Sequence, residues 1–285
     1  MNEILLNNGV KMPMIGYGVF QIQDLAQCEQ CVYDAIQAGY RLIDTASVYG
    51  NETAVGLAIK RSGIQREDLF ITSKLWVQDA GYESAKKAID LTLENLQTDY
   101  IDLYLIHRPF NDYYGAYRAM EEAYKEGKIK AIGLSNFDAA RIVDLMMNNE
   151  IKPAVVQVEC HPFYQQEDLR EFLQENNILM EAWAPFAEGK KHIFQNDVLK
   201  TIAQKYGKSV AQVILRWNIQ RQIVPLSKTV HTNRMEENLA VFDFELSQED
   251  MHFIASLDEN QTLFGKNENP DYAKLINSIK IHGDF

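Results

Sequence analysis

Four side chains in the first half of the chain have the types and the order needed for proton transfer, namely Asp44, Tyr49, Lys74 and His107. A free tyrosine has a pKa of about 10, and a nearby lysine ammonium lowers that pKa because it stabilises the phenolate. Lys74 is expected to be that neighbour, with Asp44 as its counter-ion, and His107 can orient a carbonyl oxygen by hydrogen bonding. Together the four residues predict a tyrosine that donates a proton to a carbonyl oxygen.

These residues stand at or just past the ends of short apolar runs. Ser135 and Asn136, Gln157, Trp183 and Lys228 follow four later runs in the same way. Any one of them alone would be interpreted as an exposed cap or a solvated charge. If the runs are parallel strands of one barrel, their ends meet at one rim, where barrel enzymes place their active sites. Seven such strand ends together favour an active site.

Short β-rich runs alternate with amphipathic helical stretches along the whole chain, which indicates parallel strands joined by crossover helices. The predicted strands are 14–17, 42–44, 69–73, 101–106, 131–134, 155–158, 178–182 and 223–226. The predicted helices are 25–38, 53–61, 82–96, 116–126, 139–148, 167–175 and 210–221, with shorter ones at 198–205, 235–240 and 248–256.

Eight such units predict an α/β fold, a single (β/α)8 TIM barrel that forms one domain over residues 1–285. The runs 4–6 and 10–12, joined by Asn7-Asn8-Gly9, predict a β-hairpin that caps the bottom of the barrel.

The composition excludes several classes of function. The chain has 285 residues, of which 46% are hydrophobic and 24% charged, and its formal net charge is −12. Such an acidic chain is a poor binder of nucleic acids or anionic membranes. No signal peptide, no membrane-spanning run and no even set of cysteines is recognised, so we expect a cytoplasmic protein. We also expect a monomer or a weak dimer. The histidines show no metal-ligand spacing, so no metal is expected.

Two tempting motifs are discounted. Cys28 and Cys31 have the C-x-x-C spacing of a redox pair, but they lie within a helical pattern and are interpreted as packing residues. Gly16-Tyr17-Gly18 begins like a dinucleotide fingerprint, but position 21 is Gln21 and no helix opens there, so a Rossmann fold is not expected.

Several segments of this chain, in order, resemble the aldo-keto reductase family, bacterial type with a short C-terminal tail, and the resemblance covers essentially the whole chain. The matching segments are Gly39 to Ala46, Tyr49 to Glu52, Ile71 to Trp76, Asp99 to His107, Gly133 to Phe137, Gln157 to Pro162 and Lys228 to Asn238. The resemblance implies a barrel enzyme that reduces an aldehyde, ketone or keto-sugar with NADPH. It places the family's catalytic tetrad on Asp44, Tyr49, Lys74 and His107.

The resemblance also implies cofactor and substrate contacts. Ser135, Asn136 and Gln157 match residues that hold the nicotinamide carboxamide, and Trp183 matches the aromatic residue that stacks on the ring. The adenine and 2′-phosphate region is matched by Lys228, Thr229, Arg234, Glu237 and Asn238. The small-molecule carbonyl substrate is expected to contact Phe20, Trp76, His107 and Phe110, in a fairly open site because the tail after about Asn260 is short.

Two departures and two rival functions remain open at this point. The last strand leads into Leu226-Ser227-Lys228-Thr229, where the family usually has Ile-Pro-Lys-Ser. Arg108 stands where a bulky apolar residue is common, and it could form an outward salt bridge or add charge to the substrate rim. One rival is a barrel enzyme in which Lys74 forms a Schiff base. The other is a cofactor-binding redox sensor, or a poorly catalytic member of the same fold.

Overall fold

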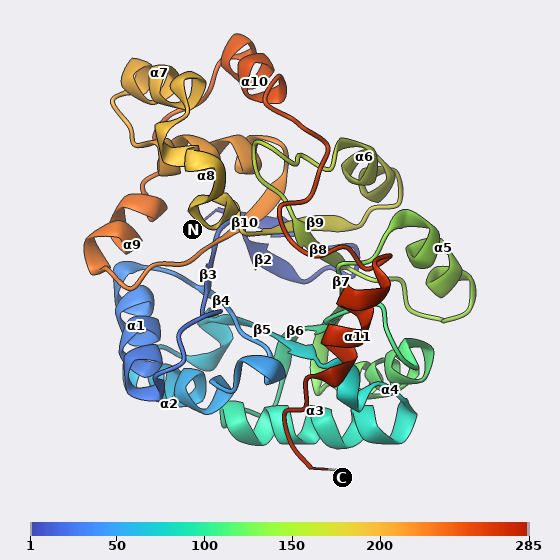
Figure 1. The fold of residues 1–285 in the computed structure, drawn as a ribbon. Helices are drawn as coiled ribbons and strands as arrows, with labels where there is room; N and C mark the ends of the chain where they lie inside the picture. Colours follow the sequence, from blue (N-terminus) through green and yellow to red (C-terminus); the bar gives the residue numbers. More distant parts are fainter. Residues whose placement is uncertain (1, 284–285) are drawn as a thin grey trace.

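The computed structural model describes residues 2–283, and its centre is a closed barrel of eight parallel strands (Figure 1). Around the barrel the strand order is β10-β3-β4-β5-β6-β7-β8-β9. The strands are β3 (Gly16–Gly18), β4 (Leu42–Asp44), β5 (Phe70–Leu75), β6 (Ile101–Ile106), β7 (Ile129–Ser135), β8 (Val155–Glu159), β9 (Leu179–Trp183) and β10 (Ile223–Ser227). The predicted (β/α)8 fold class is confirmed.

Helices lie between successive strands of the barrel and surround it, and further helices follow the last strand, β10 (Figure 1). They are α1 (Leu25–Ala38), α2 (Glu52–Ser62), α3 (Tyr82–Leu96), α4 (Tyr113–Lys125), α5 (Ala139–Met147), α6 (Glu167–Glu175), α7 (Asp197–Tyr206), α8 (Val210–Gln220), α9 (Thr232–Leu239), α10 (Gln248–Ala255) and α11 (Pro270–Ser278). Several begin at side chains that accept hydrogen bonds from otherwise unpaired backbone N–H groups, as Asp24 does for α1 and Asp138 for α5. Ser209 and Gln212 form a reciprocal capping box at the start of α8.

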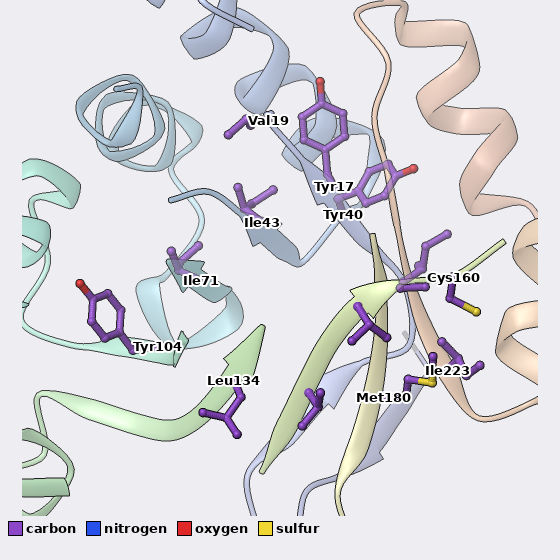
Figure 2. Packing of buried hydrophobic residues seen from close by; sticks show 14 of the residues in the cluster. Tyr17, Val19, Tyr40, Ile43, Ile71, Tyr104, Leu134, Cys160, Met180 and Ile223 are labelled. Carbon is purple, nitrogen blue, oxygen red and sulfur yellow. The ribbon is translucent and has the colours of Figure 1, made fainter. Parts of the chain in front are cut away.

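Alternation along each strand divides the core into two layers. One layer lies between the strands and the helices, where Ile43, Ile71 and Tyr104 pack (Figure 2). Their chain neighbours Leu42 and Phe70 point the other way, into a separate cluster that also contains Leu103, Leu105, Val155 and Val224. Because side chains two residues apart share a face, residues 44, 72 and 74 fall on the inward side.

The predicted hairpin is present as β1 (Glu3–Leu5) and β2 (Lys11–Pro13), paired antiparallel. Leu6 and Met12 join the inward cluster. The turn is held by Asn7, whose Nδ2 donates to the Pro153 carbonyl at 2.9 Å, just before β8 begins. The hairpin therefore closes the barrel at the amino ends of its strands, away from the predicted site.

The C-terminal tail packs over the other end of the barrel, where the carboxyl ends of the strands lie. Asn267 Nδ2 donates to the Asn136 carbonyl at 2.7 Å, and the Trp76 indole N–H donates to the Ile279 carbonyl at 2.9 Å. These bonds tie α11 across the loops that follow β5 and β7 (Figure 1). The tail therefore forms one wall at this end of the barrel, which was not predicted.

Among residues 2–283, no helix is both long enough and apolar enough to cross a membrane.

Candidate active site

The centre of the site is an ion pair inside the barrel. Lys74 Nζ lies 2.7 Å from Asp44 Oδ1, and it also donates to the Thr45 carbonyl at 2.9 Å and to the Tyr49 hydroxyl at 3.3 Å. The Lys74 side chain is fully buried and that of Asp44 nearly so. Strand parity explains the pair, since Asp44 stands two residues past Leu42, and Lys74 four past Phe70, on the inward face.

Tyr49 reaches the pair from a short 3-10 turn, Ser47–Tyr49, that follows β4. The Ser47 hydroxyl donates to the Lys74 carbonyl at 3.0 Å, which fixes the turn against β5. The buried Asn51 accepts from the Thr45 hydroxyl at 2.8 Å and donates to the Val19 carbonyl at 3.1 Å. The loop that carries Tyr49 is therefore held at both ends by buried hydrogen bonds.

The protonation states suit a proton donor. Burial raises the pKa of Tyr49 above its usual value, and the Lys74 charge offsets only part of that rise. Lys74 lowers the pKa of Tyr49, as expected, but burial raises it by more, so Tyr49 is protonated at neutral pH. Burial also disfavours the Lys74 charge, yet Asp44 and Tyr49 outweigh it, and the pKa of Lys74 is raised.

His107 follows β6 and faces Tyr49, with 5.7 Å between the two ring centres. Burial, with the charges of Lys74 and Arg108, lowers the pKa of His107 well below its usual value. The imidazole is therefore neutral, and it can donate one hydrogen bond without carrying a charge. Its Nδ1 is buried and has no hydrogen-bond partner among residues 2–283.

Gln157 connects Asp44 to a second buried carboxyl, Glu181. Its side-chain amide donates to Asp44 Oδ2 at 2.9 Å and to Glu181 Oε2 at 2.7 Å. Burial, together with the Asp44 charge, raises the pKa of Glu181 to about 8. Glu181 was not predicted as a site residue. Leu179 packs against the inward cluster, and Glu181 lies two residues later on the same face of the strand, so strand alternation could have placed it inside the barrel.

Three of the four residues predicted for the nicotinamide, Ser135, Asn136 and Trp183, lie together at the ends of β7 and β9. The Asn136 side chain donates to the Ser135 hydroxyl at 2.9 Å and accepts from the Trp183 indole N–H at 2.9 Å. Asn136 has a φ of 66°, a left-handed conformation that asparagine tolerates better than most residues. Trp183 is also held by Phe264 of the tail, with ring centres 5.1 Å apart.

These groups line one cavity of about 740 Å³ at the carboxyl ends of the strands. Its predicted members are Phe20, Asp44, Tyr49, His107, Ser135, Asn136, Gln157, Trp183, Lys228 and Arg234, and the tail adds Phe264, Gly265 and Tyr272. Trp76 and Phe110 do not line this cavity. They pack instead in a small cluster with Ile276 and Tyr272 of the tail, which the sequence did not predict to be structured.

The five residues predicted for the adenine and phosphate region differ in accessibility. Lys228 and Arg234 are exposed and line the cavity. Thr229 and Asn238 are buried; the Thr229 carbonyl accepts from the Tyr17 hydroxyl at 2.6 Å. Glu237 is half-buried on α9. The two cations can reach a ligand, whereas Thr229 and Asn238 shape the backbone around them.

The cysteines take no part in the site. Cys28 and Cys31 are buried in the outer core and form no disulfide, and burial raises the pKa of Cys28 to about 12. Within the described residues, no group of three or more His, Cys, Asp or Glu side chains is arranged to hold a metal ion.

Comparisons with known proteins show which family the chain belongs to. Residues 14–259 match the model of the aldo/keto reductase family. Glyoxal reductase from Bacillus subtilis is 48% identical over 271 residues, which cover 95% of this chain and 96% of that protein. NADPH-dependent D-xylose reductase from Meyerozyma guilliermondii is 38% identical, over 90% of this chain and 94% of that protein.

Solved structures share the whole architecture. An aldo-keto reductase from a Medee basin deep-sea metagenome superposes with a TM-score of 0.92 at 43% identity, covering 94% of this chain and 100% of that one. The Bombyx mori aldo-keto reductase in complex with NADP has a TM-score of 0.89 at 33% identity, covering 94% and 96%. The family match extends over most of the chain, and the first relative named above is 48% identical over 95% of it. The chain therefore belongs to the aldo/keto reductase family of nicotinamide-dependent oxidoreductases.

Proposed function

We propose that this enzyme reduces small carbonyl compounds to alcohols with NADPH, and that Tyr49 supplies the proton. The observation that carries the proposal is the Tyr49 hydroxyl, which lies 3.3 Å from the buried Lys74 ammonium and lines the same cavity as His107 and Trp183. The names of two relatives, a glyoxal reductase and an NADPH-dependent D-xylose reductase, support this substrate class and this cofactor.

The residues around the cavity fit a nicotinamide cofactor. Ser135, Asn136 and Gln157 offer hydroxyl and amide groups of the kind that pair with a carboxamide, and Trp183 presents an aromatic side chain beside them. Lys228 and Arg234 line the same cavity and suit an anionic phosphate. Such a cofactor, when bound, supplies the hydride that reduces the carbonyl carbon.

The chain's own side chains then manage the proton. Tyr49 donates its hydroxyl proton to the carbonyl oxygen, and the Lys74 ammonium stabilises the phenolate that remains. Asp44 and the Thr45 carbonyl keep the ammonium in place. The neutral His107 can donate a hydrogen bond to the same carbonyl oxygen, which orients it toward Tyr49. The carbonyl thus gains one hydride and one proton and becomes an alcohol.

A Schiff-base function for Lys74 is less well supported. An amine nucleophile needs a lowered pKa and a free lone pair. The pKa of Lys74 is raised instead, and its Nζ has three oxygen partners. The other rival, a cofactor-binding redox sensor or a poorly catalytic member of the same fold, is less well supported because Asp44, Lys74, Tyr49 and His107 lie together.

The test is NADPH oxidation with glyoxal, methylglyoxal and a keto-sugar, by wild type and by Tyr49→Phe. The variant keeps the ring but loses the proton, so turnover should fall by roughly 10²- to 10⁴-fold. NADPH binding, followed by quenching of tryptophan fluorescence, should be unchanged. Retention of more than about a tenth of the wild-type turnover, with chemistry rate-limiting, would contradict the role of Tyr49.

A further inference from the structure

One cation in the cavity, Arg108, has no assigned ligand, although its charge helps to lower the pKa of His107. Arg108 directly follows His107 in the chain and lines the cavity together with His107 and Tyr49. Its guanidinium carbon lies 5.5 Å from the ring centre of Tyr272, on α11. Its Nε is buried and has no hydrogen-bond partner among residues 2–283. The guanidinium also has a hydrogen-bond interaction with the Tyr272 side chain. A guanidinium presents five donors and no acceptor, so the donors left over beside Tyr272 suit an anion.

The nearby carboxylates are engaged elsewhere. Asp44 is paired with Lys74. The charge of Glu159 raises the pKa of Arg108, but its carboxylate is bound to other groups. Glu159 Oε1 lies 2.9 Å from His161 Nε2 and accepts from the Leu263 backbone N–H at 2.9 Å. Besides Asp44, one carboxylate within the described part of the chain lines the cavity that Arg108 shares with Tyr49, the exposed Glu188. Arg108 also borders a neighbouring cavity, which is lined by Glu159 and other carboxylates. No ion pair joins Arg108 to any carboxylate in residues 2–283, so an outward salt bridge does not explain it.

The position of Arg108 also separates it from the cations expected to bind the cofactor. It follows β6, whereas Lys228 follows β10, and these strands lie four places apart in a closed ring of eight. The two strands are therefore on opposite sides of the barrel, with Tyr49 following β4 between them. A ligand anion at Arg108 is not the phosphate end of a cofactor held at Lys228.

The wall behind Arg108 is built closely. A Cβ at Gly265 would lie 2.0 Å from the Tyr272 ring, so the tail backbone packs directly on that ring and holds it in place. Burial lowers the pKa of the Arg108 guanidinium, a cost that a bound anion would relieve. The guanidinium is therefore positioned by its surroundings without being neutralised by them.

We propose that Arg108 binds the carboxylate of an anionic carbonyl substrate, so that this reductase acts on aldehydes or ketones that carry a carboxylate and converts them to hydroxy acids. The inference rests on the carbonyl reduction proposed above and names its substrate class. Arg108 touches the part of the substrate that does not react and selects it by charge, while Tyr49 and His107 act on the carbonyl oxygen.

The experiment compares each acid with its uncharged methyl ester, which keeps the same reacting aldehyde. The pairs are glyoxylate with methyl glyoxylate, and 4-oxobutanoate with methyl 4-oxobutanoate, which place the carboxylate at two distances. Rates of NADPH oxidation are measured for wild type, Arg108→Leu, Arg108→Lys and the control Arg118→Leu, which removes an equal charge from the exposed face of α4.

In at least one pair, wild type should prefer the acid, and Arg108→Leu should lose roughly 10- to 100-fold in kcat/KM for that acid. The ester should change by less than about threefold, which also reports that the variant is folded. Arg108→Lys should lose less than Arg108→Leu, because it keeps the charge without the planar fork. Arg118→Leu should behave as wild type.

An equal loss on acid and ester, or no loss on either, would overturn the inference and leave Arg108 as a packing residue for Tyr272. Wild type that reduces the esters as well as or better than both acids would overturn it too. Failure of wild type to reduce any of the four aldehydes, or methylglyoxal, with either nicotinamide cofactor would instead contradict the proposed function itself.

Discussion

The Lys74 ammonium lies 3.3 Å from the hydroxyl of Tyr49, although 25 residues separate them in the chain. The ammonium is held by the Asp44 carboxylate at 2.7 Å, inside a barrel that excludes water from all of the Lys74 side chain. A charge buried in this way acts strongly on a neighbouring hydroxyl, because little solvent screens it. In the proposed reaction, this buried charge stabilises the phenolate that Tyr49 becomes.

Asp44→Asn should damage both stability and catalysis. Asp44 accepts from Lys74 at one oxygen and from Gln157 at the other. Asparagine has one acceptor oxygen, so it can accept from Lys74 or from Gln157 but not from both in this geometry. Its NH2 group would then face the remaining donor. Removing one partner of a buried ion pair costs about 3–5 kcal/mol, and we expect about 3 because one acceptor remains.

The measurement is urea unfolding together with a pH–rate profile of NADPH oxidation. The control is Asp197→Asn, whose side chain is 99% exposed at the start of α7. If Asp44→Asn unfolds at the wild-type urea concentration and keeps the wild-type pH profile, the ion pair does not have the role assigned to it.

Glu181 should make the stability depend on pH between about 4.5 and 8. Its pKa is raised from 4.5 to about 8 in the folded protein, so folding takes up a proton over this interval. Stability gained from the protonated carboxyl is therefore present at low pH and is lost as pH rises toward 8. The slope cannot exceed about 1.4 kcal/mol per pH unit for one proton.

Glu181→Gln keeps the acceptor for Gln157 but cannot ionise. The free energy of unfolding of wild type, relative to this variant, should fall as pH rises from 5 to 8. Glu175→Gln, at an exposed position on α6, should leave the pH dependence unchanged. Parallel stability curves for wild type and Glu181→Gln would show that Glu181 does not take up a proton on folding.

Much of the site followed from the sequence because strand periodicity is a local property. Once 42–44 and 69–73 are strands, alternation puts Asp44 and Lys74 on the same side as Leu42 and Phe70. Parallel pairing then brings their carboxyl ends to one rim, as the pairing of Asp44 with Thr72 shows. The direction of the net pKa shift of Tyr49 did not follow, because it depends on how completely the barrel and loops bury the hydroxyl.

The tail was the part that the sequence analysis missed. Asn269 caps α11, accepting from the backbone N–H groups of Asp271 and Tyr272, and Pro270 opens the helix, so a local start signal was present. No local signal indicated that this helix docks near Trp76, because the docking depends on contacts across about 200 residues of chain. Trp76 and Phe110 consequently pack beneath the tail, and Trp76 also packs against His107, with ring centres 5.2 Å apart.

Gly265→Ala should loosen this docking. The added methyl would meet the Tyr272 ring within 2.0 Å, so either the ring or the tail backbone must move. Overpacking of this kind typically costs about 1–3 kcal/mol. Hydrogen exchange of residues 266–283 should become faster, while exchange in the barrel strands stays unchanged. Gly283→Ala is the matched control, because a methyl there meets nothing within 4 Å; equal exchange in both variants would argue against close packing at Gly265.

Arg234→Ala should reduce the preference for NADPH over NADH. Arg234 and Lys228 are the two exposed cations that line the cavity near β10, and NADPH differs from NADH by a 2′-phosphate. Solvent screens both cations, so together we expect them to favour NADPH by roughly 10- to 100-fold in kcat/KM at low salt.

Loss of Arg234 alone should reduce that ratio by roughly 3- to 10-fold, through a weaker kcat/KM for NADPH and an unchanged value for NADH. The effect should shrink as salt is added, because screening weakens the contact in wild type. Arg118→Ala, an equal loss of charge on the exposed side of α4, should leave the ratio at the wild-type value. Equal use of both cofactors by wild type, or an identical ratio in Arg234→Ala at low salt, would mean that these cations are ordinary surface charges.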